Sequence, residues 1–87
     1  MKYRKKPVVI DAIQWNGDNI EKIMAFMYPE EPQYMGNQFS NADDIIGINT
    51  LEGLMIANIK DWIIRGVKNE IYPCKPDIFE MTYDLVE

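Results

Sequence analysis

Apolar residues follow a helical period in one segment of the chain, residues 19–28. Four of them fall at positions i, i+3, i+4 and i+7: Ile20, Ile23, Met24 and Met27. This spacing puts all four on one side of a helix. Asp18 and Glu21 have the spacing of a capping box at its start, and Pro29 ends it. We therefore predict a helix over residues 19–28 that packs its apolar side on a sheet.

The other patterned segments are short and typical of strands. Residues 6–15, KPVVIDAIQW, carry apolar side chains on both faces, which is typical of a strand in the centre of a sheet. Four further segments predict two hairpins: 44–50 with 54–58, and 61–67 with 70–74. In the first turn Gly53 supplies a positive φ, and in the second, Lys68-Asn69, the asparagine tolerates it.

The remaining segments complete the expected fold. Residues 29–44 contain two prolines and four acidic residues without any period, so we expect a loop with one short extended piece at 38–40. Pro76 starts one helical turn, and residues 82–86 are expected to be extended beside the first strand. The predicted fold class is α+β: a curved antiparallel sheet of five or six strands with one packed helix. Such a sheet could close into a small, partly open barrel.

The length of 87 residues predicts a single domain, residues 1–87. The net charge of −5 is unevenly spread. Residues 1–10 carry four basic and no acidic residues, whereas residues 11–87 carry five basic and fourteen acidic residues, a balance of −9. The simplest interpretation is a solvated basic end, and the alternative is an arm that contacts phosphate or an acidic patch. Nucleic-acid binding is not expected, because only Tyr3 interleaves the basic residues.

The residue types exclude most enzyme classes. The chain has no histidine and a single cysteine, Cys74, so Ser-His and Cys-His catalysis and the common zinc sites are not expected. Lys75 next to Cys74 would favour the thiolate, but no partner base exists. We predict no enzymatic activity, no cofactor and no metal. The lone cysteine fits the reducing cytoplasm, and the chain lacks the run of about 20 apolar residues that a membrane span needs. An exposed strand edge would allow a homodimer.

Arg65 is a lone charge among the aliphatic residues of its predicted strand. Strict alternation places it on the face of Ile63, opposite to Trp62. The planar guanidinium suits either a buried ion pair, with Asp61 or Glu70, or an anion ligand in a pocket. The sequence leaves both alternatives open.

Two blocks of 13 and 23 residues, YRKKPVVIDAIQW and DWIIRGVKNEIYPCKPDIFEMTY, resemble a family of small phage and prophage proteins, the PGDYG family. In that family the segment before the tryptophan or tyrosine reads Pro-Gly-Asp-Tyr. Here Ile59-Lys60-Asp61 stands in the place of Pro-Gly-Asp, so the Pro-Gly turn is expected to be absent. The resemblance implies a phage-encoded domain in the cytoplasm of a bacterial host and brings no catalytic residues.

These observations favour a non-catalytic phage accessory protein that binds a host protein and modulates host defence or replication. Its site is expected on the long loop, at Tyr34, Gln38 and Phe39. The alternative is a small-ligand binder, such as a sponge for a nucleotide signal, with five candidate residues: Trp62, Arg65, Lys68, Tyr72 and Lys75. A structural or virion-associated role is a third hypothesis.

Overall fold

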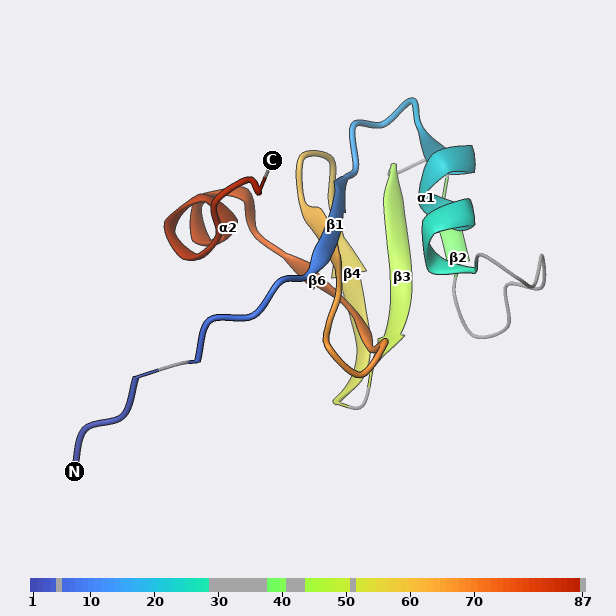
Figure 1. Cartoon of the computed structure of the whole chain (residues 1–87). Helices are drawn as coiled ribbons and strands as arrows, with labels where there is room; N and C mark the ends of the chain where they lie inside the picture. Colours follow the sequence, from blue (N-terminus) through green and yellow to red (C-terminus); the bar gives the residue numbers. More distant parts are fainter. Residues whose placement is uncertain (5, 29–37, 41–43, 51, 87) are drawn as a thin grey trace.

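Two β-hairpins form where the sequence predicts them (Figure 1). β3 (Ile45–Thr50) pairs with β4 (Gly53–Ala57), and β5 (Trp62–Arg65) pairs with β6 (Ile71–Cys74). Gly53 has a φ of +107° and Asn69 a φ of +64°, so each reversal uses a residue that tolerates left-handed backbone. The structure, a computed structural model, describes residues 1–4, 6–28, 38–40, 44–50 and 52–86.

The six strands of the described residues form two antiparallel sheets of three strands each. β1 (Asp11–Gln14) joins the second hairpin in the order β1-β5-β6, and β2 (Gln38–Ser40) joins the first in the order β2-β3-β4. The α+β class and the short extended piece at 38–40 are confirmed. The prediction of one curved sheet is wrong, because the turn after β4 carries the chain from one sheet into the other. The strands that the structure describes do not close into a barrel.

β1 lies at the edge of its sheet, whereas the sequence pattern of residues 6–15 predicted a central strand. Only Asp11–Gln14 pair with β5, and the side chains of Val8 and Val9 remain 45% and 74% exposed. The central place is taken by β5, because it pairs with β1 on one side and β6 on the other. The strand with apolar residues on both faces is therefore left with one unpaired edge.

α1 (Ile20–Met27) forms as predicted and buries its apolar side against both sheets. Ile20 and Met24 pack on a core of seven buried residues: Trp15, Ile23, Met27, Ile46, Ile48, Ala57 and Ile63. The predicted stripe is thus confirmed, and burial of this apolar area is the main source of stability.

The start of α1 differs from the predicted capping box. The N-cap residue is Asn19 rather than Asp18, and its side chain does not cap the helix. Its Oδ1 accepts a hydrogen bond from the backbone N–H of Asn16, and its Nδ2 donates one to the carbonyl oxygen of Gln14. Asn19 therefore ties the end of β1 to the start of α1.

α2 (Pro76–Thr82) lies on the opposite side of the β1-β5-β6 sheet from α1 (Figure 1). It is a seven-residue helix where the sequence predicted a single turn. Residues 83–86 follow it without pairing to β1, so the strand expected there does not form. Neither of the described helices has the length and apolar character to cross a membrane.

Candidate partner-binding surfaces

Both faces of the central strand β5 are occupied by packing. Alternation along the strand puts Ile63 and Arg65 towards α1, and Trp62 and Ile64 towards α2. Ile63 and Ile64 have no exposed surface, which shows that each face is covered. The faces of this strand therefore serve the fold.

Arg65 holds α1 to the sheet. Its Nη2 donates a hydrogen bond to the carbonyl oxygen of Phe26, near the end of α1, and its guanidinium carbon lies 4.5 Å from the centroid of the Phe26 ring. The hydrogen bond satisfies a helix carbonyl that has no partner within the helix, and the ring adds a cation–π contact. The ion pair that the sequence suggested with Asp61 does not form, because Asp61 pairs with Lys75 instead.

The five candidate ligand residues do not converge. Trp62 and Tyr72 face α2, whereas Arg65 faces α1 on the other side of the sheet. Lys68 lies exposed in the turn between β5 and β6, and Lys75 pairs with a buried carboxylate. A nucleotide could not contact the aromatic and the guanidinium groups of this set together.

Asp61 organises the turn that links the two sheets. Its carboxylate is 5% exposed and accepts hydrogen bonds from the backbone N–H of Asn58 at 2.9 Å and from Lys75 Nζ at 3.1 Å. Its own backbone carbonyl accepts the N–H of Trp15. These two hydrogen bonds hold the Asp61 side chain in the turn. Loss of the carboxylate would leave the Asn58 N–H unsatisfied.

The turn itself is present although the Pro-Gly sequence is not. The N–H of Asp61 donates to the carbonyl oxygen of Asn58, and Lys60, the third residue of the turn, has a φ of +80°. Ile59 has no positive φ, so the geometry is that of a type II turn, in which glycine normally fills the third position. The expectation that this turn would be absent is wrong, because its hydrogen bonds hold it with lysine in place of glycine.

Stacked aromatic rings attach α2 to the sheet. The Trp62 and Phe79 rings lie 4.1 Å apart between centroids at an angle of 7°, and Phe79 lies 5.1 Å from Tyr83. Burial, a hydrogen bond with the Tyr83 side chain and the nearby Glu70 carboxylate raise the pKa of Tyr72 to about 12. Phe79 of α2 therefore occupies one face of the Trp62 ring.

The lone cysteine has no sign of reactivity. Burial and the charges of Asp61 and Asp77 raise the pKa of the Cys74 thiol, which disfavours the thiolate. The lowered pKa that Lys75 suggested is therefore wrong, since Lys75 directs its charge to Asp61. Across the described ranges, no group of His, Cys, Asp and Glu side chains is placed to hold a metal ion.

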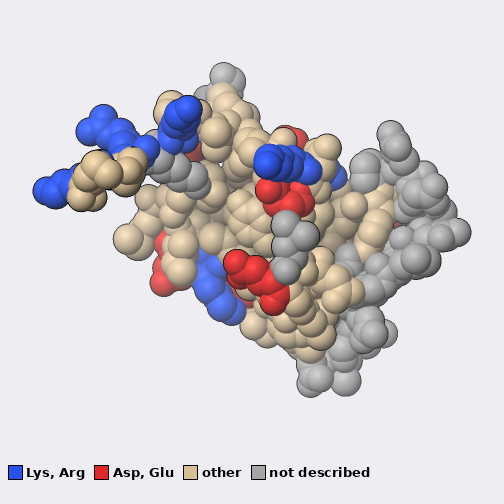
Figure 2. Space-filling model, turned by 90° about the horizontal axis from the view of Figure 1, so that it is seen from below, with Lys and Arg blue, Asp and Glu red and all other residues tan. Residues whose placement is uncertain are grey.

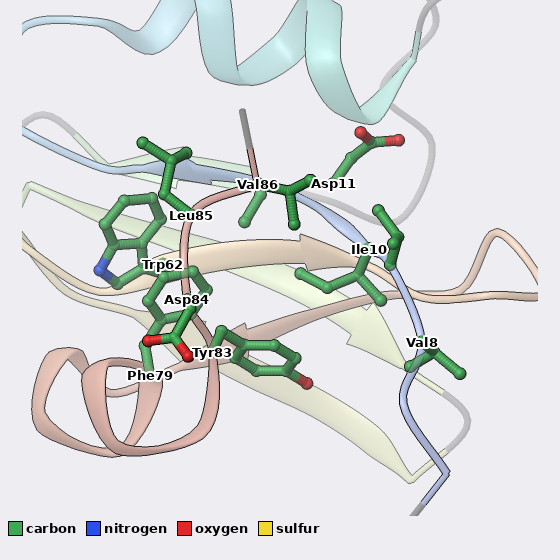
Figure 3. A pocket seen from close by; sticks show the side chains of 11 residues that line it. Val8, Ile10, Asp11, Trp62, Phe79, Tyr83, Asp84, Leu85 and Val86 are labelled. Atoms are coloured by element: carbon green, nitrogen blue, oxygen red, sulfur yellow. The ribbon is translucent and has the colours of Figure 1, made fainter.

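A groove of about 560 Å³ crosses the outer side of the β1-β5-β6 sheet (Figure 3). It lies between residues 8–12, which lead into β1, and residues 83–86, which follow α2. Trp62 and Phe79 also line it, and Asp11 and Asp84 supply its carboxylates. Most of its wall is aliphatic: Val8, Val9, Ile10, Ala12, Leu85 and Val86.

A second apolar surface lies at the edge of the other sheet. β4 pairs with β3 alone, and Leu54, Met55 and Ile56 are 64%, 38% and 41% exposed. The sequence contained one signal of this, since residues 53–57, GLMIA, are apolar throughout and carry no charge. Beside β4 lies a smaller pocket of about 270 Å³, lined by Thr50, Glu52, Met55, Glu70, Ile71 and Tyr72.

The loop residues predicted to bind a partner are only partly placed. Gln38 and Phe39 belong to β2, where they pair with Gly47 and Ile46 of β3. Tyr34 lies outside the described residues. The loop strand and the exposed β4 therefore form the two edges of the same sheet.

Basic side chains gather at the end of the chain that projects from the molecule (Figure 2). Lys2, Arg4 and Lys6 are all exposed there, on the segment that leads towards β1.

Comparison of the chain with protein-family models, with curated proteins and with solved structures finds no match.

Proposed function

We propose that this chain is a non-catalytic binding protein that captures an extended segment of a partner protein at the edge of β4. The observation that carries the proposal is the exposure of Leu54, Met55 and Ile56 on a strand with one unpaired edge. Strands at sheet edges are normally protected by charge, proline or a bulge. β4 has neither a charged residue nor a proline, so its edge is suited to strand addition.

The pocket beside β4 supports recognition of a basic side chain. In strand addition the backbone supplies affinity, and pockets for alternate side chains supply specificity. Met55, Ile71 and Tyr72 offer an apolar wall for the stem of a lysine or arginine, and Glu52 and Glu70 offer carboxylates for its head. The partner segment is therefore expected to have apolar residues at alternate positions and to contain one Lys or Arg.

The resemblance to small phage proteins supports a host protein as the partner, and hence a phage accessory role. The loop strand β2 forms the other edge of the same sheet, and it is the alternative position for the partner. The geometry gives no matching support for nucleotide binding, because Phe79 stacks on Trp62 and Arg65 is bonded to α1. A thermal-shift panel of cyclic and linear nucleotides tests that alternative directly.

The test of the proposal compares three proteins in capture of partners from a bacterial host lysate: the unaltered chain, Leu54→Lys and Val67→Lys. Leu54 and Val67 are 64% and 66% exposed, so neither substitution disturbs the core. A lysine on an edge strand opposes strand addition. We expect Leu54→Lys to lower the affinity for the captured protein at least about tenfold, or about 1.4 kcal/mol, and Val67→Lys to leave it unchanged.

Cross-linking locates the segment that is captured. A photo-reactive amino acid in place of Ile56 should cross-link to an extended, Lys- or Arg-containing peptide of the partner, identified by mass spectrometry. If Leu54→Lys keeps full capture while Gln38→Ala abolishes it, the site is on the loop strand and the assignment to β4 is wrong. If neither variant changes capture, neither edge of this sheet is the binding site.

A further inference from the structure

We propose that two copies of this chain pair in antiparallel fashion along residues 8–14, which makes β1 an interior strand of a continuous six-stranded sheet. The strand order would be β6-β5-β1 of one copy followed by β1-β5-β6 of the other. This contact uses the sheet that does not carry β4. The proposal therefore goes beyond the proposed function, and the unpaired edge of β4 stays free in each copy of the dimer.

The first support is a mismatch between the sequence and the position of β1. Val8, Val9 and Ile10 are β-branched residues of high strand propensity, directly continuous with β1. In the single chain these three lie outside the ladder, and Val9 is 74% exposed. Apolar residues on both faces are typical of a strand with neighbours on both sides. A second copy would supply the missing neighbour.

The second support is the groove beside this unpaired edge. Residues 8–12 form one side of it, and Leu85 and Val86, 86% and 70% exposed, form part of the other (Figure 3). The groove of about 560 Å³ has room for side chains that a neighbouring strand would bring. Val8 and Ile10 of a second copy would extend its aliphatic wall and cover exposed aliphatic groups of the first.

The third support is charge, which identifies the occupant as a second copy. Residues 1–10 carry four basic groups and no acid, whereas the rest of the chain has a balance of −9. Asp11 and Asp84 lie on the groove, and Asp18 and Glu21 lie exposed beyond the end of β1. An antiparallel partner would carry its basic segment past Gln14 towards these acids. The attraction is reciprocal, as the two-fold symmetry of a homodimer requires.

The pairing of the two β1 segments that satisfies the requirements of both the groove and the charges is centred on Ile10. With Ile10 opposite Ile10 of the second copy, Val8 lies opposite Ala12 and Lys6 opposite Gln14. Paired residues then share a face, so Val8, Ile10 and Ala12 of both copies line one joined groove. Asp11 of one copy lies opposite Val9 of the other copy rather than opposite Asp11 of the other copy. This register therefore avoids a repulsive pair of like charges.

Disulfide trapping tests the register. Ile10→Cys is made in a Cys74→Ser background and exposed to oxidised glutathione. Residues directly opposite in an antiparallel ladder have Cα atoms about 4.5–5.5 Å apart, within the range of about 4.4–6.8 Å that a disulfide allows. We expect Ile10→Cys to form a disulfide-linked dimer at least about tenfold faster than Leu54→Cys, which places a thiol on the other exposed edge strand.

Sedimentation equilibrium of the unaltered chain provides the second measurement. We expect a dimer that is weakened at high salt, and at least about tenfold weaker when Lys2, Arg4 and Lys6 are replaced by glutamate. A chain that stays monomeric at millimolar concentration, or a dimer trapped only through Leu54→Cys, overturns the proposal. A foreign peptide held in the groove of a monomer would also overturn it. None of these outcomes alters the capture assay, in which no residue of 1–14 is changed.

Discussion

Replacement of Lys60 by glycine tests the assignment of the turn between the two sheets. Lys60 has a φ of +80°, a backbone region that L-residues adopt at a cost of about 1–2 kcal/mol. The turn persists because two hydrogen bonds join its last residue, Asp61, to its first, Asn58. The N–H of Asp61 donates to the Asn58 carbonyl oxygen, and the Asp61 carboxylate accepts the Asn58 N–H. Lys60→Gly should therefore remove strain without disturbing these bonds.

The expected gain is the difference between two effects. Glycine removes the steric cost of the positive φ, but its greater freedom in the unfolded chain returns about 0.5–1 kcal/mol. The Lys60 ammonium contacts Asn16 Oδ1 at 3.5 Å on the exposed surface, and its loss changes little. We expect a net stabilisation of about 0.5–1 kcal/mol, or a rise in Tm of a few degrees for a domain of this size.

Urea unfolding followed by circular dichroism gives the free energy, and an unchanged m-value would show that the unfolded state is the same. Two controls isolate the cause. Lys60→Ala loses the ammonium but keeps the strained φ, so it should not stabilise. Asn69→Gly acts at a φ of +64°, which asparagine already tolerates, so its gain should be smaller. If Lys60→Gly is no more stable than Lys60→Ala, the strain does not exist and the turn is wrongly assigned.

Four further substitutions test the contacts that position the surfaces. Because the pKa of Tyr72 rises from 10.0 to about 12 on folding, only the unfolded chain releases this proton between those pH values. Stability should therefore fall over that range, by less than the about 2.7 kcal/mol of a full two-unit shift because solvent screens the partly exposed Tyr72. Tyr72→Phe should remove this part of the pH dependence in urea titrations. Asp61→Ala should cost about 2–3 kcal/mol, whereas Lys75→Ala, which removes the exposed partner, should cost less than about 1 kcal/mol; equal losses would contradict a structural role centred on the carboxylate. Phe79→Ala should increase hydrogen exchange of the α2 amides while β3 amides stay protected, and uniform exchange would refute the stacking role.

The sequence predicted the local elements well because local interactions determine them. The apolar stripe of α1 and the two tight turns depend on residues only a few positions apart, and both hairpins form with the expected partners. Gly53 and Asn69 mark the reversals because few other residues adopt the required φ. The stripe also identified which side of the helix would be buried.

The order of the strands and the partners of the charged residues could not be predicted from the sequence. Which strand becomes central depends on long-range pairing, and residues 6–15 and β5 have similar apolar patterns. The partners of charged groups depend on the same packing: Arg65 reaches a helix carbonyl, and Asp61 takes Lys75 from fourteen residues away. The missing proline and glycine at 59–60 suggested a lost turn, but hydrogen bonds to Asp61 preserve it.

The candidate binding surfaces have no motif of their own in the sequence because of where they lie in the sheets. β5 has Arg65 and Ile63 committed to α1 and Trp62 committed to α2, so the polar and aromatic residues that a motif search selects are part of the frame. The described strands with a partner on one side only are β1 and β6 in one sheet and β2 and β4 in the other. Of these, β4 and the segment that leads into β1 expose apolar side chains. An edge binds mainly through backbone N–H and C=O groups, which every residue carries, and it needs only apolar side chains that tolerate contact. A site of this kind is specified by position in the sheet rather than by residue type, so its location becomes visible only once the strand order is known.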